Sequence, residues 1–506
     1  MSAIARWWHS DDLRGLWAAT VCALIFAVAA ALPLTPHDLW FHIRLGQQMV
    51  ETRALITTDI FSYTQYGEGY FYNAWLSELV LYGLWTFGGA PLLVLTRALC
   101  VVCFYAIFLR LAWRASGSER WSAWFILFAA LASFPHWQLR PQTFVLPIFA
   151  LFVVILTRYL EQGRAPLSWL PIAMIAWVNL HGSFVFGLLL IGLTVIGDLS
   201  ARIAMGERDS VLTRDQSLRL LVWAILTFAA VLLNPLGVGM LATVFDVGST
   251  PAIQSGVLEW LPTTIREFPA NLLYLLVLAW LIGMILSHAR GRVAPALWAL
   301  AFVGLGWYAQ RNVLWASALL ALPLALVWRD VSARVATRGS ALATHWLARF
   351  FWQPKRLAGM RVLILLALVG VALLPMTRGI VGGDDLRAWV SGDTPIDVVE
   401  YIRKNNLRGR MYHEIGAGSY LMWALWPQHQ VFIDSRINLY PAEQWREYFA
   451  VWHVSEGYET ILDKYQVEYV LADTFWMPQL ITALQKRERT WTLMFQSGQS
   501  FLFRRR

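Results

Sequence analysis

Residues 16–34 read LWAATVCALIFAVAAALPL, and the next twelve, residues 35–46, read TPHDLWFHIRLG. The first stretch contains no charged side chain. About 20 apolar residues can cross the hydrocarbon of a bilayer as a helix, because a helix satisfies its own backbone polar groups. No clear small-residue cleavage site follows, so we predict a retained first membrane span rather than a signal peptide.

Similar apolar runs recur along the chain. Of the 506 residues, 58% are hydrophobic and only 14% are charged. The second run is overlong and contains Gly88, Gly89 and Pro91, so we expect a short helix over 79–87 and a span that begins near Leu92. The predicted fold class is a polytopic α-helical membrane protein with about eleven transmembrane helices, near 15–34, 79–112, 121–135, 141–160, 167–180, 183–200, 218–233, 269–287, 294–308, 312–328 and 361–376.

Basic residues predict the orientation of these spans. If the N-terminus is cytoplasmic, the Arg-rich loops lie inside and the Arg-poor loops outside. The net charge of +9 then reflects topology, and we expect no nucleic-acid partner. The segments predicted outside are 35–78, 134–141, 180–183, 234–268, 309–312 and everything after 377, whereas the inner loops include Arg110, Arg114, Arg158, Arg164, Arg202, Arg219 and the stretch from Arg329 to Arg361.

The chain divides into two predicted domains. Residues 1–377 form the membrane domain, with 35–78 as its first outer loop, and residues 384–506 form a soluble α/β domain. In the second domain, 396–405 predicts a helix capped by Asp393 or Thr394 ahead of Pro395. Short strands are predicted over 430–434, 467–471 and 500–504.

Asp38 is the most informative residue of the first outer loop. If it opens a helix, the helix dipole favours its carboxylate, and His42 lies four residues on along the same face. Trp40, Phe41 and Leu45 are then expected to keep that helix along the membrane surface. Spacing alone leaves open the alternative that Asp38 only caps an interfacial helix.

The predicted chain has a carboxylate just after the first span, an outer loop with surface helices, then many spans and an outer C-terminal domain. This plan resembles the GT-C superfamily, membrane glycosyltransferases that use polyprenyl-phosphate-linked sugars and include protein O-mannosyltransferases and aminoarabinose transferases. Several short runs carry a closer resemblance, namely Asp38-Leu-Trp-Phe-His42, Asp59-Ile-Phe-Ser-Tyr-Thr64, Trp75-Leu-Ser-Glu78, Arg140-Pro-Gln142, Asn179-Leu-His-Gly182, Asn234-Pro-Leu-Gly237, Glu259-Trp260 and Phe432-Ile-Asp-Ser-Arg436. They resemble a bacterial group of uncharacterised GT-C-like proteins, with one departure, Asn73-Ala74, near which those members carry a His.

The resemblance implies a chemical role for Asp38. In that superfamily an acidic residue of the first outer loop is the catalytic or acceptor-positioning group, and Asp38 matches it. A carboxylate there can accept the proton of the acceptor hydroxyl, and cations near the bilayer surface can stabilise the departing phosphate. For this phosphate we expect Arg140, His181 and Arg311, each at the outer end of a span. Their alternative role is to anchor or cap helix ends.

Three further residues are candidates for substrate binding. His42 shares the face of Asp38. Asp59 is either an Asx cap or a ligand of a divalent cation, as in the oligosaccharyltransferase branch, and the sequence leaves the metal unassigned. Glu259, in the long outer loop, covers either donor or acceptor, or belongs to a surface helix that seals the bundle. Asp434 and Arg436 are interpreted as a structural ion pair at a strand end.

The preferred function is a glycosyltransferase of the bacterial inner membrane that acts on the periplasmic face. Its expected partners are a polyprenyl-phosphate-linked sugar donor, membrane lipid, and an acceptor that is a glycan, lipid or protein. No cofactor is expected with certainty, and a divalent cation remains open. The alternatives are a surface-polysaccharide polymerase or ligase and a non-catalytic scaffold for glycan assembly. A transporter is disfavoured because we find no paired repeats and few charges deep in the spans.

Overall fold

The structure is a computed structural model of the whole chain. It describes residues 15–71, 73–205, 212–243, 258–289, 291–338, 361–383 and 385–506. The middle of the predicted outer loop 234–268 and most of the Arg-rich stretch 329–361 lie outside the described residues.

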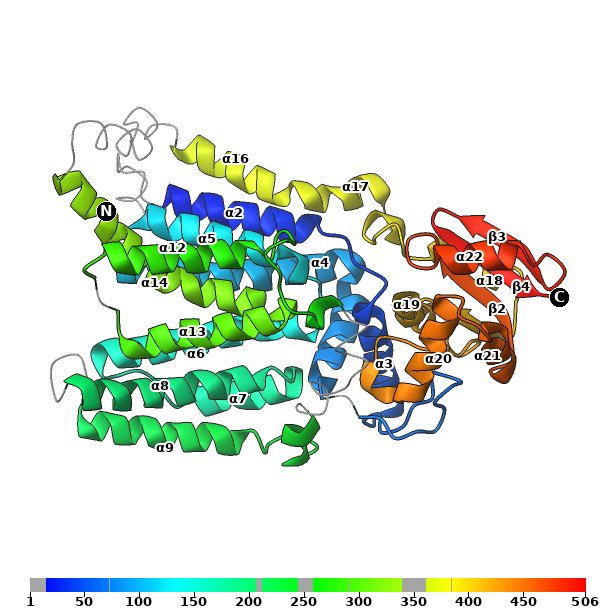
Figure 1. Cartoon of the computed structure of the whole chain (residues 1–506), viewed down its shortest axis with the longest axis horizontal. Coiled ribbons are helices and arrows are strands. Elements are labelled where there is room, and N and C mark those ends of the chain that lie inside the picture. The colour runs from blue at the N-terminus through cyan, green and yellow to red at the C-terminus, as the bar shows by residue number, and fades with distance from the viewer. Residues whose placement is uncertain are drawn as a thin grey trace.

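Each of the eleven predicted apolar runs forms a helix. These helices lie side by side along the long axis of the molecule (Figure 1). Their bounds are α2 Leu16–Ala31, α4 Trp75–Ser116, α5 Glu119–Ser133, α6 Pro141–Gln162, α7 Trp169–Leu180, α8 Phe184–Met205, α9 Arg214–Ala230, α12 Leu272–Leu286, α13 Val293–Tyr308, α14 Val313–Arg338 and α16 Arg361–Leu373.

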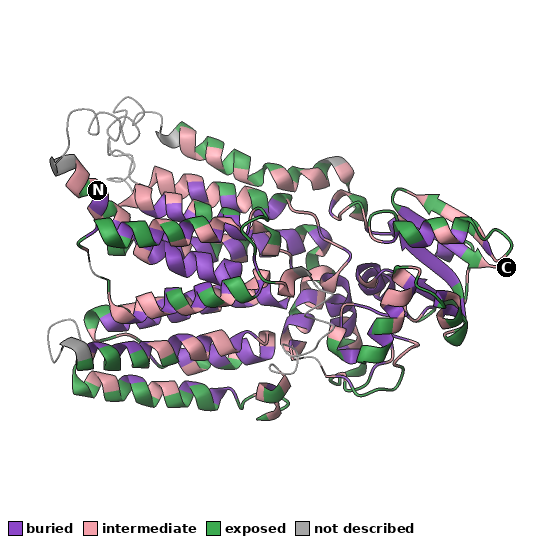
Figure 2. Ribbon diagram, in the orientation of Figure 1, coloured by how far each residue is buried: buried purple, intermediate pink, exposed green. Residues whose placement is uncertain are grey.

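Five of the described helical stretches are long and apolar enough to cross a membrane, namely Trp75–Ser116, Pro141–Gln162, Phe184–Ile203, Gln310–Val335 and Leu363–Ile380. Shorter apolar helices accompany them in the bundle, α2, α7, α12 and α13 among them. Many residues on the outer sides of the helices are exposed (Figure 2). Apolar side chains are among them, and those of Ile225 and Ile285 are 59% and 81% exposed. Such surfaces are expected of helices that contact lipid rather than water.

The predicted break in the second run is confirmed at Gly89. Its backbone has φ 55° and ψ −151°, which interrupts α4 between its first part and the long span. Only glycine adopts this region readily. Pro91 follows within the helix and fits the start of the second part, where a missing N–H costs least.

Alternate connections between the helices lie at the end of the bundle where the C-terminal part is found (Figure 1). Here the chain forms α3 Asp38–Thr52 and the short 3₁₀ turns η1 Phe134–His136, η2 Leu258–Trp260 and η3 Gln310–Asn312. The predicted helix opening at Asp38 is therefore confirmed.

The predicted membrane contact of α3 is wrong. Trp40, Phe41 and Leu45 are almost completely buried in the protein. The ring of Trp40 lies 4.7 Å from that of Trp423 and 5.7 Å from that of Trp85. The apolar face of α3 packs against α4 and α19. An amphipathic helix buries its apolar face, and here the contact is with other helices of the protein rather than with lipid.

The C-terminal part is a small α/β unit, as predicted. Its four-stranded sheet has the order β1-β2-β4-β3, with β1 parallel to β2 and the other pairs antiparallel. Two short elements, η5 Leu374–Thr377 and α17 Arg378–Gly382, continue from α16. The elements of the unit are η6 Leu386–Ala388, α18 Ile396–Lys404, β1 Arg410–His413, α19 Ile415–Leu425, η7 Ile437–Leu439, α20 Ala442–Trp452, α21 Tyr458–Lys464, β2 Val467–Asp473, α22 Pro478–Gln485, β3 Trp491–Ser497 and β4 Ser500–Arg505.

Two details of this unit differ from the sequence prediction. Residues 430–434 are buried but form no strand of the sheet; Val431 makes a single parallel bridge to Ser62 in the first outer loop. Pro395 itself occupies the cap of α18, and no side chain caps that helix. Asp393 instead accepts a hydrogen bond from the Ser391 hydroxyl.

Backbone pairing joins the first outer loop to the C-terminal part. Leu34 N–H donates to the Trp389 carbonyl at 2.9 Å, and Ser391 N–H donates back to Leu34 at 2.9 Å. Val431 exchanges hydrogen bonds with Phe61 and Tyr63 in the same way. One cluster of buried apolar residues runs from the helix bundle into the C-terminal unit, so the two parts share a core.

Candidate active site

Asp38 is the first residue of α3 and stands at the end of the bundle. Its side chain is 34% exposed, the most open of the charged residues around it. The N-terminal end of a helix stabilises a carboxylate through the helix dipole and its free N–H groups. Asp38 is thus placed where a helix favours a carboxylate, and it is reachable from outside the protein.

Arg140 connects Asp38 to Glu259. It occupies the N-cap of α6, where its extended backbone precedes Pro141. One guanidinium nitrogen lies 3.5 Å from Asp38 Oδ2 and the other lies 2.6 Å from Glu259 Oε2. The Arg140 Nε is buried and has no hydrogen-bond partner among the described residues.

Arg311 holds the other oxygen of Glu259. Its Nη1 lies 3.2 Å from Glu259 Oε1, and its guanidinium stacks 4.5 Å from the ring centroid of Trp260. The Gln310 N–H donates to the Leu261 carbonyl at 3.0 Å, which fixes the two segments to each other. Two guanidiniums therefore converge on one carboxylate, the geometry that proteins also use for phosphate.

The ion pairs remain charged at neutral pH. Burial alone would raise the pKa of the Glu259 carboxyl, but Arg140 and Arg311 hold that pKa well below its usual value. Burial alone would lower the pKa of Arg140, but the carboxylates of Glu259 and Asp38 raise it. The pair of Glu259 and Arg140 is therefore charged at neutral pH.

His181 follows α7 and faces the same charges. Its Nδ1 accepts a hydrogen bond from the Ser183 N–H at 3.0 Å and lies 2.8 Å from the Ser183 hydroxyl, which in turn accepts from the Trp177 indole. Because Nδ1 is an acceptor, the neutral ring carries its proton on Nε2. Burial, with Arg311 and Arg140 nearby, lowers the pKa of His181 to about 3. His181 is therefore a neutral hydrogen-bond donor.

Two residues of this site were not among the predicted ones. His136 of η1 interacts electrostatically with the same cluster. Burial, and next the positive charge of Arg140, lower the pKa of His136 to about 4. Glu78 of α4 lies 3.2 Å from Nδ1 of His42, and both side chains are almost fully buried. His136 belongs to a predicted outer loop and Glu78 to a quoted run, but only the folded chain brings them to the site.

His42 lies beneath the surface cluster. It is 1% exposed, and its pKa is far below the ordinary value because of burial first and then His181 and Arg140. The neutral ring of His42 contacts the carboxyl group of Glu78 and thereby helps to fix the position of α3, the helix that begins at Asp38. Four of the predicted residues, Asp38, Arg140, Glu259 and Arg311, thus form one ion-pair cluster, and His181 and His42 are coupled to it electrostatically.

The architecture that carries this site is found in three solved structures. The chain aligns over 100% of its length with 75% of the archaeal oligosaccharyltransferase AglB from Archaeoglobus fulgidus, solved with an inhibitory peptide and a dolichol-phosphate, at a TM-score of 0.56 and 14% identity. An A. fulgidus oligosaccharyltransferase tethered with an acceptor peptide that contains the NVT sequon matches at a TM-score of 0.50 and 13% identity, covering 95% of this chain and 72% of that one. ArnT from Cupriavidus metallidurans in the apo state matches at a TM-score of 0.50 and 15% identity, covering 99% and 98%. These proteins share the GT-C architecture.

The chain has the GT-C fold. The predicted resemblance is confirmed at the level of fold, and the protein is a multi-pass membrane protein. No protein-family model and no curated protein matches the sequence.

Asp59 does not join the ion-pair cluster. It is completely buried and acts as an Asx cap, accepting from the Phe61 and Ser62 N–H groups and the Ser62 hydroxyl. Its Oδ1 also lies 2.6 Å from Nη1 of Arg436, whose other nitrogens bind Asp434. The predicted Asp434–Arg436 ion pair is present, and Asp59 extends it across 377 residues of sequence.

A divalent cation does not fit Asp59. Both carboxylate oxygens already accept hydrogen bonds from backbone, hydroxyl or guanidinium donors. Within the part of the chain that the structure describes, no group of three or more His, Cys, Asp or Glu residues is arranged to hold a metal ion. We derive no step through a metal.

Proposed function

We propose that this GT-C protein is a glycosyltransferase that moves a sugar from a polyprenyl-phosphate-linked donor to an acceptor hydroxyl on the periplasmic face of a bacterial inner membrane. Asp38 is the general base, Arg140 and Arg311 bind the donor phosphate, and Glu259 occupies their guanidiniums before the donor binds. The observation that carries this proposal is the convergence of both guanidiniums on one acidic group beside an accessible carboxylate.

The charges suit the bonds that change. The acceptor oxygen bonds to the anomeric carbon while the bond from that carbon to the phosphate oxygen breaks, and its electron pair leaves with polyprenyl phosphate. The acceptor proton passes to Asp38. A phosphodiester carries one negative charge, and the departing monoester carries about 1.5 to 2 at neutral pH. Two fixed guanidiniums therefore stabilise the transition state more than the donor.

His181 adds a donor without adding charge. Its Nε2–H is available for a phosphate oxygen, and its ring is oriented by Ser183 and Trp177. A neutral donor next to two cations avoids the repulsion that an imidazolium would suffer there. His136 and His42 support the same arrangement as neutral groups.

The periplasmic location rests on the grouping of loops. The site and the C-terminal unit lie at one end of the bundle (Figure 1), and the Arg-rich loops of the sequence alternate with the segments that form that end. By the positive-inside rule, the site faces away from the cytoplasm.

Replacement of Asp38 by Asn tests the proposal. Asp38 is partly exposed and makes one long ion pair, so its neutralisation should cost under about 1 kcal/mol of stability. In proteoliposomes supplied with radiolabelled polyprenyl-phosphate monosaccharides, transfer should fall at least about 100-fold. Asp215→Asn, in the first turn of α9, is the control and should keep full activity. Full activity of the Asp38→Asn protein would refute the assignment of Asp38 as the base, and transfer from pyrophosphate-linked oligosaccharides alone would refute the proposed donor.

A further inference from the structure

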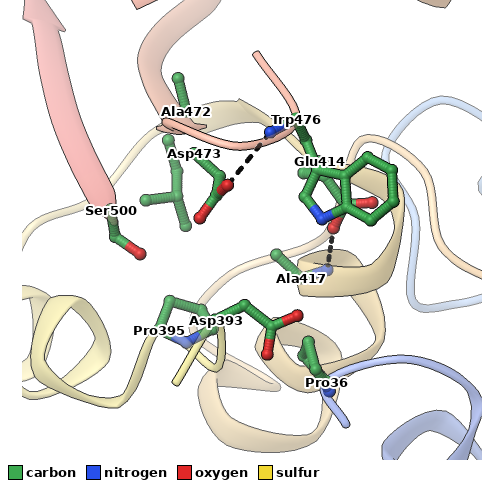
Figure 3. A pocket seen from close by; sticks show the side chains of 10 residues that line it. Pro36, Asp393, Pro395, Glu414, Ala417, Ala472, Asp473, Trp476 and Ser500 are labelled. Atoms are coloured by element: carbon green, nitrogen blue, oxygen red, sulfur yellow. Dashed lines mark hydrogen bonds between the residues drawn. The ribbon is translucent and has the colours of Figure 1, made fainter. Parts of the chain in front are cut away.

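A small pocket lies between the C-terminal unit and the residues that lead into α3. It is lined by the segments that precede α3 and α18, by the start of α19, by the end of β2 and by the start of β4. Figure 3 shows the carboxylates of Asp393, Glu414 and Asp473 around it, together with Ser500 and Trp476. It is separate from the ion-pair cluster of Arg140 and Glu259.

Asp473 presents an unsatisfied oxygen in this pocket. It is the last residue of β2, is paired in register with Ser500, and is 8% exposed. Its Oδ1 accepts from the N–H groups of Phe475 at 2.7 Å and Trp476 at 3.2 Å. Its Oδ2 is buried and has no hydrogen-bond partner within the described ranges. A buried acceptor without a donor is costly, so this oxygen favours a ligand that donates.

Three acidic side chains, Asp393, Glu414 and Asp473, line the pocket. Glu414, 6% exposed, caps α19 by accepting from Ala417 N–H at 2.7 Å. Burial raises the pKa of Glu414 and of Asp473, and the charge of Asp393 raises both further. The nearby His37 opposes this effect at Glu414 only. Three carboxyl groups thus face one small space.

A primary ammonium suits both observations. It has three N–H donors and one positive charge. A sugar hydroxyl donates one hydrogen bond and leaves the repulsion among the carboxylates in place. A metal ion needs ligands closer together than any His, Cys, Asp and Glu group among the described residues.

We propose that this pocket binds a primary ammonium group carried by the acceptor. The acceptor role rests on the proposed glycosyl transfer and on position: Pro36 lines the pocket two residues before Asp38, and their Cα atoms are at most about 7 Å apart. An acceptor anchored by its ammonium there places a neighbouring hydroxyl near the proposed base. The fold thus uses the C-terminal unit to select the acceptor.

The test measures binding of ethanolamine and ethylene glycol, which differ by an ammonium in place of a hydroxyl. The purified full chain in detergent micelles is titrated with each at pH 7, and the rise in melting temperature is followed to saturation. Ethanolamine should bind at least tenfold more tightly than ethylene glycol. Equal binding of the two, or a shift with Mg²⁺ or Ca²⁺ but none with ethanolamine, would overturn the proposal.

Asp473→Asn is the matched variant. The side-chain oxygen of the asparagine can accept the same two backbone hydrogen bonds as Oδ1 of Asp473. The NH₂ group of the asparagine then takes the place of the unsatisfied Oδ2. The affinity of this variant for ethanolamine should be at least tenfold lower than that of the wild type. Asp393→Asn, at a more exposed residue, is a second single variant and should also lower the affinity for ethanolamine. Glu488→Gln, on the exposed surface of the same unit, should leave it unchanged. Unaltered affinity in both Asp variants would sink the assignment.

The binding assay contains no sugar donor. If ethanolamine binds as expected while the wild-type chain transfers no sugar, only the proposed enzymatic function fails. If transfer depends on Asp38 while ethanolamine does not bind, only the ammonium site fails.

Discussion

His181 shows how one side chain is kept in one protonation state. Its Nδ1 is used as an acceptor by Ser183, and burial, with Arg311 and Arg140 close by, opposes the imidazolium. A cationic His181 would repel both guanidiniums. We therefore interpret the low pKa as a requirement of a site that must hold an anion with fixed donors.

This state makes stability depend on pH. In the folded chain His181 stays neutral to about pH 3, since its pKa is about 3 against an ordinary value of 6.5. The unfolded chain binds a proton below about pH 6.5, so falling pH favours unfolding. In His181→Asn, the Asn Oδ1 can replace Nδ1 as the acceptor, and the side chain does not titrate. The free energy of unfolding should therefore fall between pH 7 and pH 5 by on the order of 1 to 2 kcal/mol less in this variant than in the wild type.

Unfolding midpoints of the two proteins in denaturant at both pH values measure this difference. Other buried histidines titrate in both proteins and cancel in the comparison. Identical pH dependence of wild type and variant would show that His181 is protonated normally in the fold.

Glu259 occupies the groups that we assign to the donor. Its two oxygens lie 2.6 Å from Arg140 and 3.2 Å from Arg311, so a lipid phosphate must compete with it. Glu259→Gln removes the competing charge and should tighten binding of polyprenyl phosphate about three- to tenfold, because fewer charged contacts must be broken. A fluorescence titration in detergent micelles measures this affinity.

Glu267→Gln is the control for this prediction, because Glu267 is an exposed carboxylate in the same segment that accepts a hydrogen bond from Gln310 rather than from an arginine. Its affinity for polyprenyl phosphate should match that of the wild type. Weaker binding in the Glu259→Gln protein would mean that Glu259 helps to hold the phosphate ligands in place.

At the scale of one element, α4 combines two helices through a single glycine. The first part carries Glu78 toward His42, and the second part is the long span with Arg97 buried in it. Without the break at Gly89, the two parts would continue on one axis. The kink therefore sets where Glu78 stands relative to α3.

Gly89→Ala tests the kink. With φ 55° and ψ −151°, an alanine there is strained by about 1–3 kcal/mol, although space for its Cβ exists, with the nearest atom 3.8 Å away. The apparent melting temperature in detergent should fall. Gly83→Ala, six residues earlier in the regular helix and with no atom within 4 Å of its Cβ, should be neutral or stabilising by up to about 1 kcal/mol. Equal effects of the two substitutions would refute the role of the Gly89 conformation.

The elements were predictable where one local signal decides them. Apolar length identified all eleven runs, and Gly89 with Pro91 identified the break. Residues 430–434 were predicted as a strand because they are apolar and buried, but their backbone pairs with Phe61 and Tyr63 instead. Strands β1 and β3 were missed, since strand pairing depends on partners elsewhere in the chain.

On the scale of the whole molecule, the site is assembled from segments far apart in sequence. Topology alone predicted that the loops bearing Asp38, Arg140, His181, Glu259 and Arg311 share one end of the bundle. It did not predict which carboxylate each arginine contacts. Nor did it show that Asp59 faces Arg436, because contacts over 377 residues leave no local pattern. The prediction that Trp40, Phe41 and Leu45 contact lipid was wrong for the same reason. They are buried partly by α19, which lies far away in the sequence, in the C-terminal unit.

The junction of the two parts depends on one buried charge network. Arg436 is completely buried and binds Asp434 and Asp59, which are also completely buried. Asp434 has a further partner in the Tyr440 hydroxyl at 2.9 Å. A single guanidinium therefore compensates two carboxylates and ties the first outer loop, which leads from Asp38, to the C-terminal unit.

Removal of that guanidinium should loosen the junction. Arg436→Met leaves two buried carboxylates uncompensated and should destabilise the protein by about 3–5 kcal/mol. Limited proteolysis should then release the C-terminal unit faster than in the wild type. Arg487→Gln, which breaks an exposed ion pair with Glu459, should change stability by under about 1 kcal/mol.

The triple variant Asp59→Asn, Asp434→Asn, Arg436→Met separates charge from shape. If uncompensated charge causes the loss, neutralising both carboxylates should recover a large part of the stability, because well-packed neutral groups can replace a buried ion network at little cost. The amides keep acceptors for the Phe61 and Ser62 N–H groups. A triple variant as unstable as Arg436→Met alone would show that the guanidinium holds the junction by its hydrogen bonds and packing, and the two domains would then be joined by geometry rather than by charge balance.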